Sequence, residues 1–277
     1  MGHKKIVEPL KITFIRFVDS IHIVSYVIRN FSINPGNYVI PSLLRSYCNS
    51  LLFTIEVNYH KVDLPIINMR VNEMKLFYSK GACSLVVRIV INEIGLKSEF
   101  ESVDLKTKQT ESDQDFFQIN PKGSVPTLQL DNGVVLTENA VILQYLADTA
   151  KAHSLLPAVG NFERYRVLEW VNYITTEVHK SFGGLFNPTV SDEVKNTVFI
   201  PLIKSKFKYI NQSLEHTKYL AGDHFTLPDA YLFVMMRWAE SCKIDLSTYP
   251  KLISYQMQLK DRLSIQKSLK EEGFIKE

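Results

Sequence analysis

The sequence predicts an α/β domain over residues 74–150, followed by an all-helical domain over residues 158–277. Short β-prone runs alternate with segments of helical apolar spacing in the first region, whereas only helical spacing follows in the second. A third observation sets residues 1–73 apart, because no periodicity persists there and an organised pattern begins abruptly at Met74. The chain's 277 residues are enough for two ordinary domains.

The composition is that of an ordinary globular protein. Hydrophobic residues make up 45% and charged residues 22% of the chain, which excludes a disordered chain, a collagen-like repeat and a coiled coil. Three cysteines, Cys48, Cys83 and Cys242, are too few for a disulfide framework, so we expect a reducing, cytoplasmic compartment. Residues 1–73 carry 8 Lys and Arg against 5 Asp and Glu, and the rest of the chain carries 24 of each. Because that larger part is neutral, we expect no nucleic-acid partner.

Residues 1–73 leave three interpretations open. The favoured one is a mis-assigned, over-extended gene start, with translation beginning at Met74 or Met69. The others are an accessory or disordered extension and a targeting segment. The most apolar stretch, residues 12–31, contains Arg, Asp and His side chains, so it lacks the uninterrupted run of roughly 18 apolar residues that a membrane span needs. We therefore expect no membrane association.

Within the α/β region the expected order of elements is β-α-β-α-β-β-α. Apolar positions recur at helical spacing after Cys83, and Gly95 is a suitable residue to end that helix. Asp131-Asn132-Gly133 is a hairpin turn signal between two short strands. The expected strands are Lys75–Tyr78, Glu99–Leu105, Thr127–Leu130 and Val134–Leu136, and the expected helices are Leu85–Ile94, a short stretch near Asp115–Ile119 and Thr137 to about Thr149.

A linker is expected over Lys151–Ala158, and only helices beyond it. Thr226-Leu227-Pro228-Asp229 combines a cap residue, a proline in the first turn and an acid three residues after the cap, which strongly indicates a helix start. Asn187-Pro188 and Ile200-Pro201 are expected breaks or kinks. The helices are expected near Phe162–Phe182, Asp192–Glu215, Leu227–Cys242, Pro250–Leu259 and Ile265–Glu272.

Cys83 is the sharpest candidate for chemistry, because it lies where a strand turns into a helix. Unpaired backbone N–H groups and the helix dipole favour an anion there, so we expect its thiolate to be more available than that of a free cysteine. The alternative is that Cys83 is simply a small buried residue. Position 86 is Val, so there is no C-x-x-C pair and the natural redox partner would be an external thiol.

Two further features lie in the same region. If Val125-Pro126 is cis, the backbone of Val125 turns outward and can pair with an extended peptide; the alternative is an ordinary trans proline in a turn. At the next helix start, Asn139 and the N–H groups could bind a carboxylate, and Glu138 an ammonium group. The alternative for Glu138 is a simple acid of the first helical turn.

His179-Lys180 near a helix end is the fourth feature. The pair could donate hydrogen bonds to a bound thiol, or it could merely complement the negative end of the helix dipole. Cys48 and Cys242 have no His or Cys at metal-ligand spacing, so no metal site is expected. The sequence also lacks a Gly-rich phosphate loop.

From Met74 to about residue 272, these features together resemble bacterial beta-class glutathione S-transferases. The resemblance implies a thioredoxin-like N-terminal domain, an all-helical C-terminal domain and a homodimer. The strings that carry it are Met74-Lys-Leu-Phe-Tyr-Ser-Lys-Gly-Ala-Cys83-Ser, Asn120-Pro-Lys-Gly-Ser-Val-Pro126, Leu136-Thr-Glu-Asn139, Glu169-Trp-Val-Asn172 and Glu177-Val-His-Lys180.

The resemblance also implies roles in glutathione binding. Cys83 would face the glutathione sulfur and could form a mixed disulfide with it, and the backbone of Val125 would pair with the cysteinyl unit. Glu138 and Asn139 would hold the γ-glutamyl end, and Lys108 the glycyl carboxylate. The residues expected to reach over from the helical domain are Asn172, Thr176, Glu177, Val178, His179 and Lys180, with His179 beside Cys83 as a catalytic residue.

This sequence departs from the family pattern at two positions. Lys80 stands where this class commonly has proline, so we expect a looser turn and a positive charge beside the thiol. Asn139 stands where many members have Ser or Gly, and we expect binding to survive because Asn can still hydrogen-bond a carboxylate. Tyr78 is expected to be a supporting residue.

The expected function is a glutathione S-transferase that conjugates the glutathione thiolate to small hydrophobic electrophiles, as in detoxification. The acceptor is expected between the domains, against Phe182 and Phe186. One alternative is glutathione-dependent disulfide or peroxide reduction through Cys83. Another is a non-catalytic ligand-binding protein on the same fold.

Overall fold

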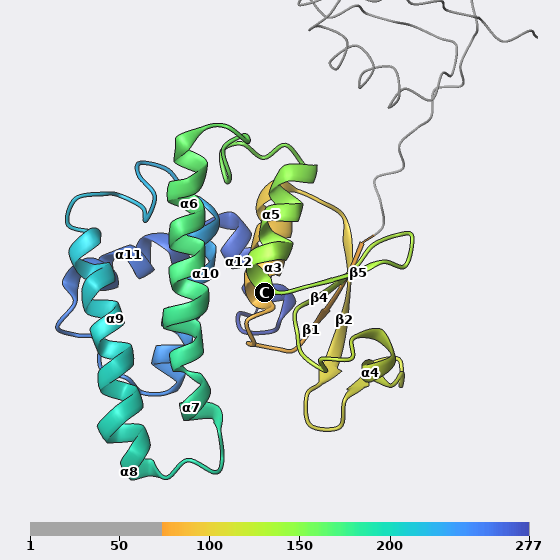
Figure 1. The fold of residues 1–277 in the computed structure, drawn as a ribbon, viewed down its shortest axis with the longest axis horizontal. Coiled ribbons are helices and arrows are strands. Elements are labelled where there is room, and N and C mark those ends of the chain that lie inside the picture. Colours follow the sequence, from red (N-terminus) through yellow and green to blue (C-terminus); the bar gives the residue numbers. More distant parts are fainter. Residues whose placement is uncertain (1–73, 277) are drawn as a thin grey trace, which may run out of the picture. The chain divides into compact units, whose positions relative to one another are not determined.

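A five-stranded mixed sheet forms the first part of the structure, a computed structural model that describes residues 74–276. The expectations for residues 1–73 lie outside the described residues. The strands are Met74–Tyr78 (β1), Ser98–Asp104 (β2), Gln109–Thr110 (β3), Thr127–Gln129 (β4) and Val135–Thr137 (β5), and the helices among them are Leu85–Ile94 (α3), Phe116–Ile119 (α4) and Asn139–Thr149 (α5) (Figure 1).

The central strand of the sheet is β1, and the strand order is β3-β2-β1-β4-β5. Strand β1 runs parallel to β2 and antiparallel to β4, while β2–β3 and β4–β5 are antiparallel pairs. The predicted order of elements is confirmed with one addition, β3, which was missed because its two residues are too few to show alternation. A parallel pair requires a crossover, and α3 provides it, so the turn that contains Cys83 lies at the carboxyl end of β1.

Helix α3 is buried on every face. Residues 85–91 are all buried, including Arg88, because the helix packs against α5 as well as α10 and α12. Such all-round burial is typical of a helix enclosed in a core. Gly95 ends the helix in the left-handed conformation with φ of 68°, as predicted, and its N–H bonds the carbonyl of Ile91.

Helices form the rest of the described chain and lie on the side of α3 away from most of the sheet (Figure 1). They are Phe162–Tyr173 (α6), Ile174–His179 (η1), Gly183–Phe186 (α7), Asp192–Val194 (α8), Lys195–Phe199 (η2), Ile200–Ser213 (α9), Leu227–Ser241 (α10), Pro250–Lys260 (α11) and Leu263–Glu271 (α12). None of the described helices combines the length and the apolar character needed to cross a lipid bilayer.

Two long predicted helices contain π-helical segments. Helix α6 continues without a gap into η1, and α8 continues through η2 into α9, so the predicted helical stretches are correct in outline. Asn187 ends α7, as expected of a residue before proline. The break expected at Ile200-Pro201 is wrong, because Pro201 lies in the first turn of α9 directly after η2.

Helix α10 is the centre of the helical domain and starts as predicted. Thr226 and Asp229 form a capping box, and Asp229 is fully buried. Its carboxylate accepts hydrogen bonds from the N–H groups of Leu220 (2.9 Å) and Thr226 (2.7 Å), from Thr226 Oγ1 (2.8 Å) and from the hydroxyl of Tyr255. The same carboxylate therefore starts α10 and attaches α11 and the preceding loop to it.

We expect Asp229→Ala to lower the free energy of unfolding by about 3 kcal/mol or more, because several buried donors lose their acceptor together. Denaturant unfolding measures the change. Asp223→Ala is the matched control, since Asp223 is exposed and its loss should change stability by no more than about 0.5 kcal/mol. Equal effects of the two substitutions would contradict this role of Asp229.

Candidate active site

The turn between β1 and α3 is closed by its own hydrogen bonds. The N–H of Ala82 donates to the carbonyl of Ser79 (3.0 Å). Ser84 Oγ accepts from the Ser79 N–H (3.2 Å) and donates to the Ser79 carbonyl (3.3 Å). Cys83 lies in this turn one residue before Ser84, the N-cap of α3, so it is near the helix start as predicted.

The Cys83 thiol faces the second predicted feature. Its Sγ donates to the carbonyl oxygen of Val125 at 3.3 Å, and the Val125-Pro126 peptide bond is cis, which resolves the alternative left open by the sequence. Burial raises the pKa of the thiol to about 11, although the Asn139 side chain and the Lys180 charge act in the opposite direction. The expectation of a readily available thiolate is therefore wrong, because burial outweighs the helix start.

Asn139 joins the start of α5 to the thiol turn. Its Nδ2 donates to the Cys83 carbonyl at 3.2 Å. Its Oδ1 is buried and has no hydrogen-bond partner among the described residues. A buried acceptor without a partner is costly, so this oxygen is suited to receive an N–H from a ligand.

Glu138 binds an ammonium group within the protein itself. Lys122 Nζ donates to its Oε1 at 2.7 Å, and this hydrogen bond lowers the pKa of the Glu138 carboxyl. The side chain is largely exposed, and residue 138 adopts φ of 72° immediately before α5. Glu138 thus already pairs with an ammonium group, that of Lys122, and its binding of a ligand ammonium stays a prediction.

His179 meets the same group of residues from the helical domain. Its Nδ1 lies 2.7 Å from the hydroxyl of Tyr231, and its ring lies edge-on to Trp238. Burial, and secondarily the charge of Lys180, lower the pKa of His179 to about 4. The ring is therefore neutral at physiological pH, and within the His179-Lys180 pair the helix-dipole alternative rests on Lys180 alone.

Six of the predicted site residues belong to this neighbourhood. Cys83 contacts Val125 and Asn139, while the charges of Glu138 and Lys180 act on both Cys83 and His179. Residues from the thioredoxin-like domain and the helical domain thus meet at the end of β1. We call this group the thiol cluster: Cys83, Val125, Glu138, Asn139, His179 and Lys180.

The other predicted binding residues have partners of their own. Lys108 Nζ donates to the Gly123 carbonyl at 2.8 Å. Thr176 Oγ1 donates to the backbone carbonyl of Asn172 (3.0 Å), and both residues are exposed. Glu177 accepts from Lys206 Nζ at 2.6 Å. None of these side-chain hydrogen bonds or ion pairs of Lys108, Thr176 and Glu177 reaches the thiol cluster.

Three expectations fail because packing turns the side chains elsewhere. Val178 and Phe182 are fully buried in the hydrophobic core, so the Val178 side chain cannot reach glutathione and Phe182 cannot line an open acceptor site. Lys80 donates to the carbonyl of Gly273 (3.3 Å) and lies 5.1 Å from the ring centroid of Phe274. Its charge is thus directed to the end of the chain.

Sequence reasoning missed three residues that support the thiol turn. Tyr231 bonds His179, Trp238 Nε1 donates to the Gly81 carbonyl (2.8 Å), and Glu272 Oε2 accepts from the Gly81 N–H (2.8 Å). Polar aromatic residues inside an otherwise apolar helix were the only signal for Tyr231 and Trp238. For Glu272 there was none, because it lies 191 residues from Gly81.

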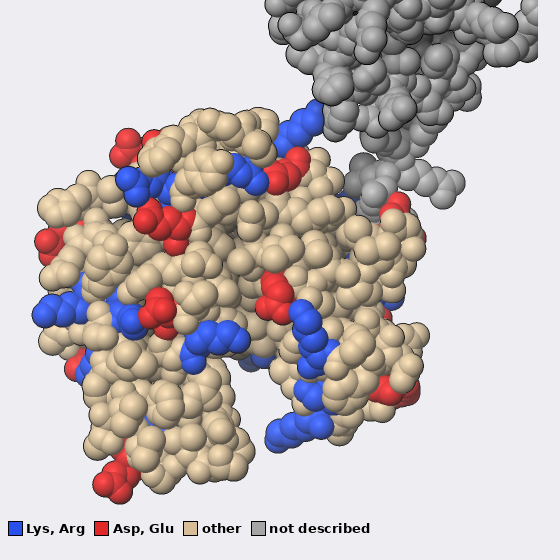
Figure 2. All heavy atoms as spheres, viewed as in Figure 1, with Lys and Arg blue, Asp and Glu red and all other residues tan. Residues whose placement is uncertain are grey.

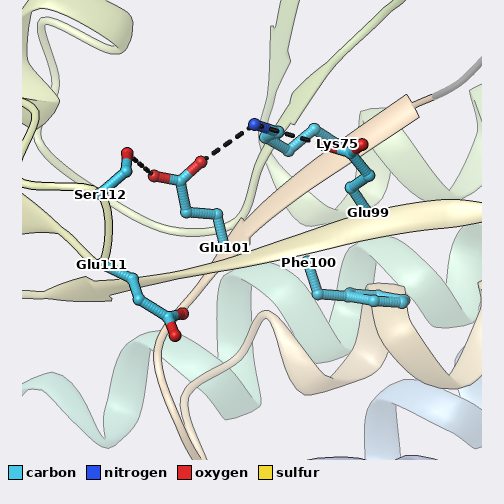
Figure 3. A pocket seen from close by; sticks show the side chains of 6 residues that line it. All are labelled: Lys75, Glu99, Phe100, Glu101, Glu111 and Ser112. Atoms are coloured by element: carbon cyan, nitrogen blue, oxygen red, sulfur yellow. Dashed lines mark hydrogen bonds and ion pairs between the residues drawn. The ribbon is translucent and has the colours of Figure 1, made fainter.

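A hollow of about 290 Å³ lies elsewhere, lined by residues of β1, of β2 and of the segment after β3 (Figure 3). Glu101 lies between Lys75 and Ser112 there and bonds both of them. The polar side chains of the hollow thus pair with one another. Lys75 lies near the start of β1, whereas Cys83 follows the end of that strand. This hollow is therefore separate from the thiol cluster.

Among residues 74–276, no group of three or more His, Cys, Asp or Glu side chains could hold a metal ion. Figure 2 shows Lys and Arg side chains beside a notch between the helical domain and the α/β domain. The segment between β2 and β4 contains Lys106, Lys108 and Lys122 but also three acidic residues, so it carries no net charge.

A sheet with a crossover helix, a cysteine at the turn, a cis proline opposite it and a helical second domain together define the architecture of thiol-binding transferases. Family models agree with that class. Residues 81–149 match the N-terminal domain of glutathione S-transferases, and residues 179–257 match their C-terminal domain.

The sequences and structures of individual relatives point to the same class of protein. Glutathione S-transferase GstA of Escherichia coli O157:H7 is 43% identical over 72% of this chain and 99% of its own length. A beta-class glutathione S-transferase from Sphingomonas chungbukensis (40% identity, TM-score 0.70) is matched over 73% of this chain and its whole length. A sphingomonad glutathione S-transferase solved in complex with glutathione (40% identity, TM-score 0.69) is covered to the same extent. The chain belongs to the glutathione S-transferase family, and it is a glutathione transferase close to the bacterial beta class.

We expect alkylation of Cys83 by iodoacetamide, without glutathione, to be slow at neutral pH. Since its pKa is raised to about 11, the rate constant should rise about tenfold per pH unit and reach no plateau below about pH 10. Peptide mass mapping separates Cys83 from the other cysteines. A plateau between about pH 7 and 8 would show an available thiolate and contradict the burial argument.

His179 should stay neutral over a window in which an ordinary histidine titrates. Its pKa falls from 6.5 to about 4 in the folded protein. The neutral ring therefore stabilises the fold above about pH 6.5, and that contribution is lost as the pH falls toward 4. NMR titration of the ring, assigned with His179→Asn, measures the pKa directly. An apparent pKa near 6.5 would contradict the buried, neutral ring.

Proposed function

We propose that the protein activates glutathione as a thiolate at the thiol cluster and transfers it to an electrophilic carbon of a small apolar compound. The observation that carries the proposal is the half-buried Cys83 thiol, which bonds the Val125 carbonyl and lies beside Asn139, with the charges of Glu138 and Lys180 acting on both Cys83 and His179. A relative with 40% identity has been solved with glutathione bound.

The polar groups of the cluster suit the parts of glutathione, which has a thiol, an ammonium group, two carboxylates and a peptide backbone. The backbone of Val125 is proposed to pair with the cysteinyl unit, with the glutathione sulfur facing Cys83. Glu138, which already binds the ammonium group of Lys122, is proposed to bind the γ-glutamyl ammonium instead. The unpartnered Oδ1 of Asn139 is available for a ligand N–H.

Some of the remaining proposed contacts with glutathione require a side chain to leave its present partner. Lys108 would hold the glycyl carboxylate after leaving the Gly123 carbonyl that it now bonds. Asn172 and Thr176 are exposed on the first long helical stretch, and Glu177 would have to loosen its ion pair with Lys206 to take part.

The cluster is proposed to lower the pKa of bound glutathione through neutral donors and one charge. With a pKa of about 11, Cys83 stays protonated, and its S–H would turn from the Val125 carbonyl to donate to the glutathione sulfur. Neutral His179 has a ring N–H to donate, and the Lys180 ammonium favours the anion electrostatically. The glutathione proton passes to solvent, and the thiolate is the nucleophile.

In the transfer step the glutathione sulfur forms a bond to the electrophilic carbon. The electron pair of the bond that breaks leaves with the departing group, or remains on a conjugated acceptor that is then protonated from solvent. Phe186, which is about half exposed and whose ring lies 4.9 Å from that of Trp238, offers an apolar wall for such an acceptor. We therefore place the electrophilic acceptor against Phe186 and not against the buried Phe182.

Disulfide or peroxide reduction through Cys83 is a second candidate function. Cys242 is the only other free cysteine among the described residues. A thiol with a pKa of about 11 supplies little thiolate for exchange at neutral pH. The burial of Cys83 therefore favours conjugation.

A homodimer in a reducing, cytoplasmic compartment is also proposed. Exposed apolar side chains support a partner surface, since Phe162 and Tyr165 of α6 are more than half exposed and their rings lie 6.4 Å apart. Free Cys83 and Cys242 support a reducing compartment.

Cys83→Ala should lower the rate of conjugation to a model electrophile at neutral pH by about tenfold, because one hydrogen bond to the thiolate is lost. It should abolish glutathione-dependent disulfide reduction. Cys83→Ser, which keeps an O–H donor, should conjugate faster than Cys83→Ala, and Cys242→Ala is the matched control that changes neither activity. Wild-type conjugation by Cys83→Ala would remove the thiol from the proposed mechanism.

A further inference from the structure

The peptide units of Gly81 are held on both sides by the helical domain. Trp238 Nε1 donates to the Gly81 carbonyl, and Glu272 Oε2 accepts from the Gly81 N–H, each at 2.8 Å. Gly81 lies two residues before Cys83, in the same closed turn. Its position is thus set by two side chains that reach in from α10 and from the end of α12.

Glu272 is enclosed and paired with a charge. Its side chain is fully buried, and its Oε1 lies 3.3 Å from Nε of Arg88 in the buried helix α3, an ion pair in which neither atom makes a hydrogen bond among the described residues. The guanidinium carbon of Arg88 lies 4.3 Å from the ring centroid of Tyr78 and 3.8 Å from that of Phe100. The acceptor for the Gly81 N–H therefore has little freedom to move.

The residues after Glu272 pack on the same turn. A Cβ added to Gly81, which adopts φ of +72°, would lie 3.0 Å from the Phe274 ring. The guanidinium carbon of Arg237 lies 4.4 Å from the centroid of that ring. Lys80, next to Gly81, donates to the Gly273 carbonyl. The end of the described chain thus covers the turn that presents Cys83.

We propose that Glu272 is a positioning residue for the reaction: through the Gly81 N–H it fixes the turn and keeps the half-buried Cys83 thiol against the Val125 carbonyl. This rests on the proposed function, in which Cys83 faces the glutathione sulfur. A hydrogen bond to a carboxylate is stronger than one between neutral groups. Losing this acceptor frees one side of the Gly81 peptide, so water reaches the thiol and the glutathione sulfur loses its fixed partner.

The test compares two double variants that differ only in the acceptor for Gly81. Arg88→Met with Glu272→Gln keeps an oxygen acceptor and is called the acceptor-retaining variant. Arg88→Met with Glu272→Met removes that oxygen and is called the acceptor-free variant. Removing both charges avoids an unpaired buried ion, and apolar replacement of a buried pair is often tolerated. Both full-length variants are assayed for alkylation of Cys83 by iodoacetamide without ligand, for KM and kcat with glutathione, and for thermal unfolding.

The acceptor-free variant should show Cys83 alkylation about fivefold faster at about pH 8, since a better-hydrated thiol has a lower pKa. Its KM for glutathione should rise by a similar factor. The acceptor-retaining variant should stay within about twofold of wild type in both. Glu271→Gln is the single-site control, because Glu271 also bonds Arg88 but does not bond Gly81.

Equal alkylation rates and equal KM values in the two double variants would overturn the proposal, even if their unfolding temperatures differ, because a merely structural role moves only stability. If the acceptor-free variant does not fold, Glu272→Asp, which withdraws the carboxylate by one methylene, is compared with Glu272→Gln by the same criteria. Absence of glutathione turnover in the wild type would refute the proposed function alone. The alkylation comparison would still decide the role of Glu272.

Discussion

Burial of α3 on every face is the constraint on which the rest of the structure depends. The helix packs against α5 of the α/β domain and against α10 and α12 of the helical domain, so it cannot move without disturbing the core that both domains share. Cys83 adjoins Ser84, the N-cap of this helix, and Arg88 within the helix pairs with Glu272. The position of the thiol is therefore determined by contacts with both domains.

The same burial decides the chemistry of the site. Desolvation raises the pKa of Cys83 and lowers that of His179, so both groups are neutral at physiological pH. Neutral donors in a water-poor environment can stabilise an anion formed on a ligand without first carrying a charge themselves. A site of this kind supports a thiolate on bound glutathione better than a thiolate on Cys83.

Local patterns in the sequence were sufficient for the order of elements, the Gly95 helix end, the Thr226–Asp229 capping box and the residues around Cys83. They failed where long-range packing decides the outcome. Val178 and Phe182 carry no local mark that separates a core side chain from an exposed one, and the availability of the Cys83 thiolate depends on burial that only the folded domains create. Glu272 is brought to Gly81 by tertiary structure alone.

The central claim is that Cys83 lies opposite the sulfur of glutathione bound at the junction of the two domains. Incubation of the native protein with oxidised glutathione, followed by intact-mass measurement and peptide mapping, tests this claim most directly. We predict a single glutathione adduct, reversible by dithiothreitol and confined to the peptide that contains Cys83, since proximity in the bound complex offsets the low thiolate fraction. An adduct on Cys242 in place of Cys83, or none at all, would contradict the claim.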